Sequence, residues 1–357
     1  MENLDTLKKF WNKKKVFITG HTGFKGTWLC IVLKYLNSNI HGYSLKPEKK
    51  SLFNQSKIKK DLSANTFGNI NDIAKLKATI KATKPEIIIH MAAQPLVIES
   101  YKNPLETFNT NIIGTTNLLE SIRDIKSVKS VIIITTDKVY KINKKNKSYK
   151  ELDQLGGFDP YSTSKVGAEI IVDSYIKSFF KNTKLNNKIS TVRAGNVIGG
   201  GDYSENRLVP DIIFAINNKK KITIRNPHHV RPWQHVLDPL IGYLMLAKKQ
   251  YFNKMTDGEH AWNFGPNNSN CKKVIEVVNY IKKLHNFKYV IINNKKFKET
   301  ESLRLNSNKA KIKLNWLPRW NLSKSIKNTV DWNRNIKKGF SAKFVCEQQF
   351  LMYINKK

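Results

Sequence analysis

The feature that most constrains the fold is a short apolar run that is followed at once by a glycine-rich turn. Residues 16–19 read Val-Phe-Ile-Thr, which is typical of a strand buried on both faces, and residues 27–36 then have helical spacing. Glycines between such a strand and helix let the backbone turn tightly and approach a pyrophosphate at the helix N-terminus. The pattern predicts a dinucleotide-binding unit, with a plain glycine turn as the alternative. The turn residues that we expect to contact the dinucleotide are Gly20, Gly23, Phe24, Lys25 and Gly26.

Further strands and helices follow this unit in an alternating rhythm. Residues 39–44 form the second expected strand, and residues 84–91 form another that runs into the small residues Ala92 and Ala93. Small residues directly after a strand let a cofactor lie close against the backbone. Residues 104–123 have the spacing of a helix that covers a sheet. The rhythm predicts an α/β fold of the Rossmann type, with a right-handed, doubly wound and mostly parallel sheet.

A second apolar run ends in reactive side chains. Residues 131–134 read Val-Ile-Ile-Ile and are followed by Thr135, Thr136, Asp137 and Lys138. Ligands bind at the carboxyl ends of strands in open α/β sheets, so these side chains are candidates for a site. A surface turn with a local ion pair is the alternative.

A tyrosine and a lysine open a later helical segment. Tyr161 and Lys165 are four residues apart and therefore share one helix face. An ammonium group beside a phenol favours the phenolate, so we expect Lys165 to lower the pKa of Tyr161 toward that of a useful base. An exposed helix start is the alternative.

With these segments in place, the chain resembles the extended short-chain dehydrogenase/reductases, and among them the branch of nucleotide-sugar 4,6-dehydratases that acts on CDP-glucose. The tyrosine–lysine pair and the glycine turn mark only the superfamily, whereas Asp137 marks the 4,6-dehydratases and Lys138 the CDP-glucose branch. The resemblance implies a dinucleotide-binding domain at residues 1–195 and a smaller α/β region that binds the nucleotide sugar at residues 196–357, interleaved with the first. The matching segments are FITGHTGFKGTWL, HMAAQPLV, TTDKVY, GGFDPYSTSK, TVRAGNVIGGGD, RNPHHVRPWQHVLDPL, WNFGPN and LNWLPRWNL.

The resemblance also implies a mechanism. Tyr161, assisted by Lys165, takes the proton of the sugar 4-hydroxyl while hydride leaves C4 for the nicotinamide, and Thr136 orients that hydroxyl. Asp137 protonates the departing 6-hydroxyl, which requires that burial raise its pKa. Lys138 acts either as the base at C5 or electrostatically on the enolate. Return of the hydride to C6 makes the cycle redox-neutral.

The residues implied for the two ligands extend beyond the catalytic set. The cofactor is expected to be NAD, with NADP left open because Glu48 is the only acid near the end of the second strand and Asn69 stands where relatives place an aspartate. No metal is expected. The remaining cofactor residues are Ala92, Ala93, Thr110, Tyr161 and Lys165, and the substrate residues are Gln94, Thr136, Asn196, Arg207 and Arg231.

Several other polar or aromatic residues near these motifs allow two interpretations. His90 is expected to be a hydrogen-bonded core residue rather than a catalytic one. Arg193 is either structural or in contact with the substrate. Trp233 and His235 belong either to the pocket wall or to the core.

Composition limits the other classes of protein. The chain has 357 residues and a formal charge of +36, which raises the question of nucleic acid. Its lysines are spread along the chain rather than concentrated, so we expect no specific nucleic-acid partner. Three distant cysteines and the lack of an apolar run near the roughly 18 residues of a membrane span indicate a cytoplasmic protein with no membrane partner. Residues 166–180 are apolar on more than one side, which predicts a homodimer or a higher homo-oligomer.

Four alternatives remain at this point. A 4,6-dehydratase for UDP-, dTDP- or GDP-sugars would share the chemistry, whereas a 4-epimerase would have no use for Asp137 and Lys138. A catalytically silent dinucleotide sensor and a basic RNA-binding protein are the more distant possibilities.

Overall fold

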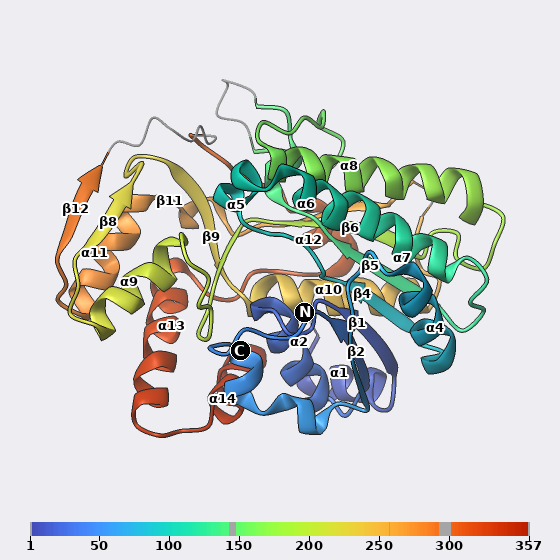
Figure 1. Ribbon diagram of the computed structural model, residues 1–357, viewed down its shortest axis with the longest axis horizontal. Coiled ribbons are helices and arrows are strands. Elements are labelled where there is room, and N and C mark those ends of the chain that lie inside the picture. The colour runs from blue at the N-terminus through green and yellow to red at the C-terminus, as the bar shows by residue number, and fades with distance from the viewer. Residues whose placement is uncertain (1, 143–147, 257, 293–300, 356–357) are drawn as a thin grey trace.

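The apolar runs of the sequence form one parallel sheet. The computed structural model describes residues 2–142, 148–256, 258–292 and 301–355, and Figure 1 shows the sheet at the centre of the larger part of the molecule. Its order changes direction between β1 and β4, so the loops after these two strands border a crevice at the carboxyl edge. The seven strands, in spatial order, are β10 (Ala261–Phe264), β6 (Ile189–Ala194), β5 (Ser130–Ile134), β4 (Ile87–His90), β1 (Lys15–Thr19), β2 (Asn39–Ser44) and β3 (Ala64–Phe67).

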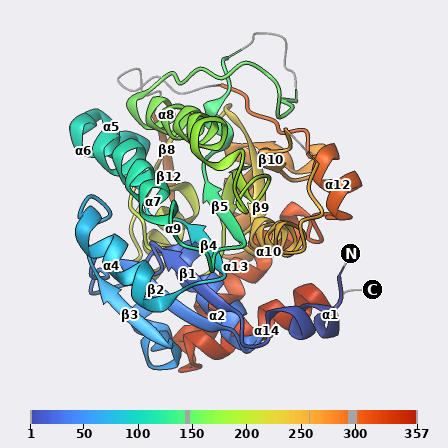
Figure 2. The ribbon, with the colours of Figure 1, turned by 90° about the vertical axis from the view of Figure 1, so that its right-hand side faces the viewer.

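Helices cover both faces of this sheet, which is why its strands read as continuous apolar runs. In β1, Val16 and Ile18 belong to the core on one face, and Phe17 belongs to the core on the other. Figure 2 shows the two helical layers with the sheet between them. The first face packs against α1 (Leu4–Trp11), α2 (Phe24–Tyr35), α3 (Leu52–Ser56), α10 (Leu237–Tyr251), α12 (Asn308–Leu314) and α14 (Ala342–Ile354). The second packs against α4 (Ile73–Thr83), α7 (Gly114–Ile122) and α8 (Pro160–Tyr175). A π-helical turn, η4 (Ile176–Phe180), continues α8.

A smaller region lies beyond the carboxyl edge of the sheet. It has its own core and includes two small sheets, at the left of Figure 1. Its elements are β7 (Asn196–Ile198), β9 (Val230–His235) and β11 (Cys271–Lys273) in one sheet, β8 (Ile222–Arg225) and β12 (Tyr289–Ile292) in the other, and the helices α9 (Leu208–Asn217), α11 (Val274–Leu284) and α13 (Leu322–Lys337).

Short elements complete the loops of the larger part. They are α5 (Val97–Lys102), α6 (Pro104–Phe108) and the π-helical turn η2 (Asn109–Ile113), which lead into α7, together with the 3₁₀ turns η1 (Ile58–Asp61) and η3 (Asp137–Val139). A further 3₁₀ turn, η5 (Asn268–Asn270), lies directly before β11 in the smaller region.

The expected α/β fold with a parallel, doubly wound sheet is confirmed. The second strand has the predicted bounds, 39–44, and the expected helix at 104–123 is the run α6, η2 and α7. Residues 237–264 return from the smaller region to the large sheet as α10 and β10. The helices α12 and α14, which lie on either side of α13 in the sequence, return to it as well, so the chain passes repeatedly between the two parts. None of the described helices is long and apolar enough to span a bilayer.

Candidate active site

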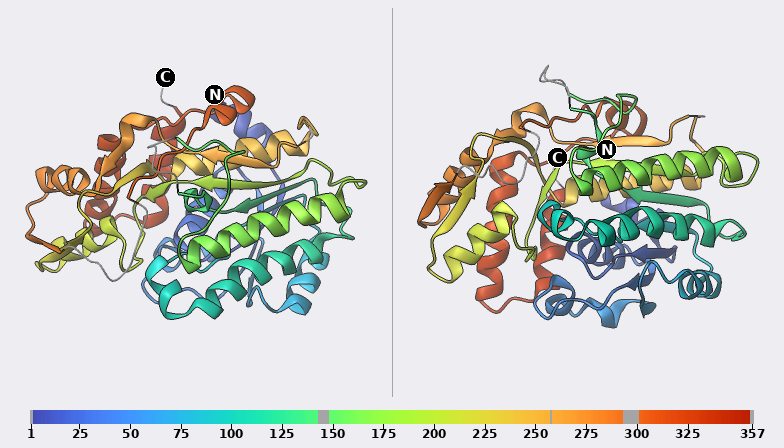
Figure 3. Two further views of the ribbon diagram at one scale, coloured as in Figure 1. Left: turned by 90° about the horizontal axis from the view of Figure 1, so that it is seen from above. Right: turned by 45° about the horizontal axis from the view of Figure 1, so that its top comes forward.

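A cavity of about 810 Å³ lies between the carboxyl edge of the large sheet and the smaller region. We divide it into three parts. The glycine-turn arm follows β1, the central part lies at the ends of β5 and the start of α8, and the α9 arm runs between β7, α9 and β8. Figure 3 shows the smaller region set against this edge of the sheet. Residues from both parts of the fold therefore face one continuous space.

The glycine turn is shaped by contacts with the sheet. Gly20 has a φ of +72°, and a side chain there would bring its Cβ within 2.6 Å of the Ala92 backbone nitrogen. A side chain at Gly26 would collide with the Gly20 carbonyl. Gly23 is different, because a Cβ there would make only an ordinary contact at 3.4 Å, and the residue caps α2 without a side-chain hydrogen bond. The free N-terminus of α2 at Gly23 is thus open to an anionic group.

The end of β2 is tied to the same turn. The hydroxyl of Thr22 lies 2.8 Å from that of Ser44 and donates to the Leu45 carbonyl at 3.1 Å. Asn69 lines the cavity beyond β3, where its carbonyl accepts from Tyr43 at 2.9 Å. These groups offer hydroxyls and amides to a ligand in the glycine-turn arm, and Glu48, beyond the end of β2, also lines the cavity.

The end of β5 delivers two polar side chains to the central part. Thr136 has an extended backbone and caps the turn η3, which begins at Asp137. Its hydroxyl lies 3.1 Å from Oδ1 of Asp137, while Oδ2 is buried and has no hydrogen-bond partner among the described residues. Burial raises the pKa of Asp137, although Lys138 opposes the shift. A carboxyl with one free oxygen and a raised pKa is equipped to donate a proton.

The start of α8 places Tyr161 opposite these groups. Asp159 caps the helix by accepting from the Ser162 backbone at 2.9 Å, and the Ser162 hydroxyl accepts from the Asp159 backbone in return. The Tyr161 backbone donates to the Ser100 hydroxyl at 3.1 Å, which joins α8 to α5. The phenol is hydrogen-bonded to Thr136. Two separate elements therefore bring Tyr161 and Asp137 into one cavity.

The pKa of Tyr161 departs from the prediction. Burial raises it to about 12, and the largest opposing influences are the Thr136 hydrogen bond and the charge of Arg207, not that of Lys165. The ammonium of Lys165 instead donates to the Ile134 carbonyl at 3.1 Å, and its own pKa is lowered to about 8 by burial and by Lys25. The expectation that spacing alone would lower the phenol pKa is wrong for this arrangement, because burial outweighs the neighbouring charge.

A buried ion pair between α8 and β6 stabilises the elements that carry the catalytic residues. Glu169, one turn after Lys165, pairs with Arg193 at 2.8 Å, and both side chains are nearly inaccessible. Its carboxylate also accepts from Thr135 and Thr191, each at 2.6 Å. The pair joins α8, β5 and β6, so Arg193 has a structural place rather than a place in the cavity wall.

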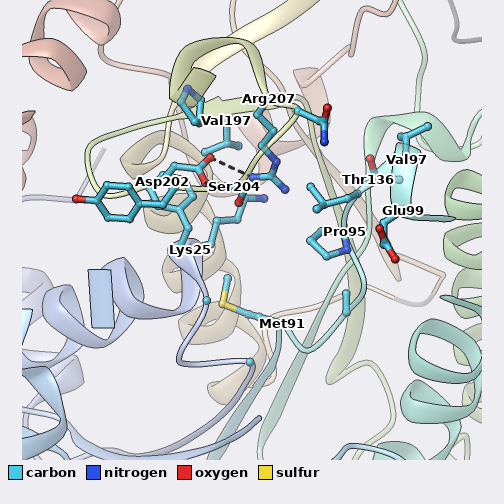
Figure 4. Close-up of a pocket in the computed structure, with 18 of the residues that line it drawn as sticks. Lys25, Met91, Pro95, Val97, Glu99, Thr136, Val197, Asp202, Ser204 and Arg207 are labelled. Atoms are coloured by element: carbon cyan, nitrogen blue, oxygen red, sulfur yellow. Dashed lines mark hydrogen bonds and ion pairs between the residues drawn. The ribbon is translucent and has the colours of Figure 1, made fainter. Parts of the chain in front are cut away.

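Cations surround the boundary between the central part and the α9 arm. Arg207 pairs with Asp202 at 3.2 Å, and Figure 4 shows Lys25 directed toward the same part of the cavity. Burial and Arg207 lower the pKa of Lys25 to about 8. Arg231 is buried and donates to the Val230 carbonyl at 3.1 Å. A polyanionic ligand would find complementary charge here.

Nearly all of the predicted residues line this cavity. The exception is Gln94, whose amide bonds to the Leu96 backbone and to Thr107 within its own loop. The predicted residues that do line it are Gly20, Gly23, Phe24, Lys25, Gly26, Ala92, Ala93, Thr110, Thr136, Asp137, Lys138, Tyr161, Lys165, Asn196, Arg207 and Arg231.

The structure also shows where three further residues lie, whose place the sequence either left open or assigned to the core. His90 is buried between the hydroxyls of Thr19 and Thr115, at 2.7 and 3.2 Å, so the expected core role is confirmed. His235 is fully buried and packs against two tryptophan rings. Trp233 belongs to the core of the smaller region and also lines the cavity.

Two supporting residues were not predicted. Asn111 donates to the Ser164 hydroxyl at 2.8 Å and to the Gln94 carbonyl at 3.0 Å, which clamps α8 to the loop after β4. Asp202 orients Arg207. The run of three glycines directly before Asp202 was a signal for a tight loop with one acid, whereas nothing local marks Asn111.

Comparisons with known proteins place these features in context. The family model described as GDP-mannose 4,6 dehydratase matches residues 17–329. A CDP-glucose 4,6-dehydratase of Salmonella typhimurium is 41% identical over 335 residues, which is 92% of each chain. A dTDP-D-glucose 4,6-dehydratase of Dictyostelium discoideum is 29% identical over 249 residues, 66% of this chain and 56% of that one.

Solved structures agree on the fold. A dTDP-glucose 4,6-dehydratase from Bacillus anthracis in complex with NAD superposes with a TM-score of 0.75 at 23% identity, covering 92% of this chain and 99% of that one. A UDP-glucuronic acid 4-epimerase from Bacillus cereus, in complex with UDP-glucuronic acid and NAD, gives 0.76 at 19% identity, covering 90% and 99%.

Proposed function

Because the chain belongs to the GDP-mannose 4,6 dehydratase family, we propose that it is an NAD-dependent hydro-lyase that converts CDP-D-glucose to CDP-4-keto-6-deoxy-D-glucose and water. The observation that carries the proposal is the meeting of Tyr161, Thr136 and Asp137 in one cavity beside the glycine turn. The identity of 41% to a CDP-glucose 4,6-dehydratase supports the choice of nucleotide sugar.

The glycine-turn arm fits a dinucleotide. Gly23 leaves the N-terminus of α2 open, and the loop after β4 presents the small side chains of Ala92 and Ala93 to the cavity, between those of Met91 and Pro95. Gly20, Gly23, Phe24, Lys25 and Gly26 would hold the pyrophosphate, with Thr110 and Lys165 farther along the cavity. NAD, when bound, accepts hydride from C4 and returns it to C6. Structural relatives that contain NAD favour it over NADP.

The first proton transfer is assigned to Tyr161. Its phenolate accepts the proton of the sugar 4-hydroxyl, and Thr136, hydrogen-bonded to the phenol, orients that hydroxyl. Lys165 lies one turn further along α8, and its ammonium group is fixed on the Ile134 carbonyl. Its positive charge stabilises the phenolate that must be present before the 4-hydroxyl proton moves, and so opposes the burial that raises the phenol pKa.

The loss of water is assigned to Asp137 and Lys138. The 4-ketone acidifies the C5 hydrogen, and departure of the 6-hydroxyl as water requires a proton at that oxygen. Asp137 supplies it, since its raised pKa keeps the carboxyl protonated more readily than an exposed aspartate. Lys138 either takes the C5 proton or stabilises the enolate. C5 regains a proton as hydride returns to C6, Tyr161 gives up the proton that it took from the 4-hydroxyl, and Asp137 takes one back. The cycle therefore consumes no net proton and needs no external oxidant.

Arg207, Arg231 and Asn196 are proposed to hold the diphosphate and the sugar. Guanidinium groups match phosphate oxygens in geometry as well as in charge, and both arginines line the cavity next to the central part.

Incubation with CDP-glucose and NAD tests the proposal. We expect a 4-keto-6-deoxy sugar, identified by its new methyl group in the NMR spectrum, with no net reduction of NAD and with deuterium at C5 in heavy water. Parallel reactions with UDP-, dTDP- and GDP-sugars test the nucleotide. A product inverted at C4 that keeps its 6-hydroxyl would instead identify a 4-epimerase.

A homodimer in the cytoplasm completes the proposal. Ile113, Ile170 and Phe179 are 48%, 58% and 43% exposed on the surface formed by η2, α8 and η4, and α7 and α8 lie side by side there (Figure 3). A second copy would cover these side chains. Light scattering should give twice the chain mass, and Ile170→Lys should reduce it, whereas Ile312→Lys on α12, which is also exposed, should not.

A further inference from the structure

The far end of the α9 arm combines apolar walls with one acid that has no direct cationic partner. Leu208, Ile222 and Val274 line this end, and Asp211, in the first turn of α9, lines it as well. No ion pair within 4.0 Å joins Asp211 to a cation among the described residues, in contrast to Asp202 with its partner Arg207.

The surroundings hold Asp211 in place without neutralising it. Burial raises its pKa to about 6, while the charge of Arg225 and the backbone N–H of Asn206 oppose the shift. The Arg225 guanidinium itself donates to the side-chain and main-chain oxygens of Asn206 at 3.3 and 3.4 Å. At neutral pH the group is therefore a partly buried carboxylate, which can only accept hydrogen bonds.

A carboxylate is costly in an arm built for an anionic ligand unless the ligand brings a hydrogen-bond donor to it. This step rests on the proposed function. With the hexose at Tyr161 and the diphosphate at Arg207 and Arg231, the nucleobase reaches the apolar end beside Asp211. Cytosine presents an amino group at C4, whereas uracil and thymine present a carbonyl oxygen there.

We propose that Asp211 selects the cytosine base of the substrate by accepting a hydrogen bond from its C4 amino group. Uracil and thymine nucleotides are then rejected, because their C4 oxygen would face the carboxylate oxygen with no proton between them. A site built to bind one polar group discriminates strongly against a ligand that lacks it.

The test is the ratio of kcat/KM for CDP-glucose to that for UDP-glucose in wild type and in Asp211→Asn. The side-chain amide of asparagine can turn to accept from cytosine or to donate to uracil. We therefore expect the ratio to fall by about 10- to 100-fold, the range for loss of a hydrogen bond to a charged group. Calorimetric affinities for CDP and UDP give the same ratio without turnover, so a slow variant remains informative.

Glu205→Gln is the matched control. Glu205 is an exposed acid in the loop before α9. Its negative charge helps to raise the pKa of Asp211, but it does not line the cavity. The Glu205→Gln variant removes one negative charge near the same arm, as Asp211→Asn does. We expect its ratio of kcat/KM for CDP-glucose to that for UDP-glucose to stay within about twofold of wild type, since no contact with the nucleobase is lost. An equal fall of the ratio in both variants would mean that net charge, not a contact, sets the preference, and would overturn the inference.

The pH dependence gives an independent readout. As pH falls through about 6 the carboxyl of Asp211 gains a proton that it can donate to a C4 oxygen, so the wild-type ratio should decline. The groups that face it are Arg225 from β8 and Asn206, Glu205 and Asp202 from the loop before α9. The decline should be absent in Asp211→Asn, and a decline that persists there would assign it to another group and contradict the inference.

The outcomes separate the two claims. A wild-type protein that turns over another sugar nucleotide better than CDP-glucose overturns the proposed function, and cytosine selection with it. A wild type that prefers CDP-glucose, together with an Asp211→Asn variant that keeps the preference, overturns the inference about Asp211 alone.

Discussion

The central part of the cavity and its α9 arm are built in different ways. Thr136, Asp137, Tyr161 and Lys165 are at most 8% exposed and sit on a strand end and a helix start that hydrogen bonds join. In the α9 arm the Arg207 side chain is 33% exposed. Buried groups on regular elements have fixed positions and shifted pKa values, whereas exposed groups act through screened charge. We therefore expect changes in the central part to alter rates by orders of magnitude, and changes in the arm to alter affinity by smaller factors.

The largest effect is expected for Tyr161→Phe. Removal of the phenol oxygen leaves no group bonded to Thr136 that can accept the 4-hydroxyl proton, so kcat should fall by about 10⁴-fold. Calorimetry should show CDP-glucose binding within a few-fold of wild type, because the ring still fills the wall. A loss of less than tenfold in kcat would remove Tyr161 from its role as base.

Glu169→Gln tests whether the support beneath the central part is as rigid as its contacts suggest. The variant leaves Arg193 charged and buried, so the free energy of unfolding should fall by about 3–5 kcal/mol in urea titrations. The pKa of Glu169 is lowered in the folded state, so its contribution is complete above the ordinary glutamate pKa of about 4.3 and is lost as pH falls through the lower value.

Asp173→Asn on the same helix is the control for this loss of stability. Asp173 pairs with Lys177 at 2.6 Å, but both side chains are more than half exposed, so we expect a change near the experimental error. Equal effects in the two variants would contradict the distinction between the buried support and the surface.

Asp137→Asn should separate the two chemical steps. The amide cannot protonate the departing 6-hydroxyl, so the loss of water should slow by about 10³-fold, whereas oxidation at C4 still has Tyr161. Reduced cofactor should therefore accumulate in a single turnover, followed by its absorbance. No accumulation with a normal product rate would assign the proton to another group.

Lys138→Arg and Lys138→Met distinguish a base from a fixed charge. Lys138 is the largest influence that opposes the raised pKa of Asp137, so it already acts as a charge on the central part. We expect Lys138→Met to lower kcat by about 100-fold and Lys138→Arg, which keeps the charge, by less than about tenfold. An equal loss in both would show that the neutral amine is needed as the C5 base.

The sequence predicted the central part better than the arm because its groups are local. Thr136, Asp137 and Lys138 follow directly from one strand, and Tyr161 and Lys165 share one helix turn. The residues that hold them depend on tertiary contacts: Asn111 reaches Ser164 across 53 positions, and Arg193 reaches Glu169 across 24. The prediction of a lowered pKa for Tyr161 was wrong for the same reason, because the burial that raises this pKa depends on the folded chain. In the α9 arm, no local sequence pattern indicated that Asp211 would lie beside the apolar end of the cavity.

Arg207→Gln should have the smallest effect and bears most directly on the comparison. The guanidinium is partly exposed and already shares its charge with Asp202 at 3.2 Å, so solvent and the carboxylate both weaken its hold on a phosphate. We expect KM for CDP-glucose to rise by about tenfold with kcat within about twofold, and the rise should shrink as salt is added. Arg334→Gln, an exposed change on α13, should leave KM unaltered. If instead kcat fell by 100-fold, Arg207 would be acting on the reacting atoms, as its influence on the Tyr161 pKa allows, and the arm could not be separated from the chemistry.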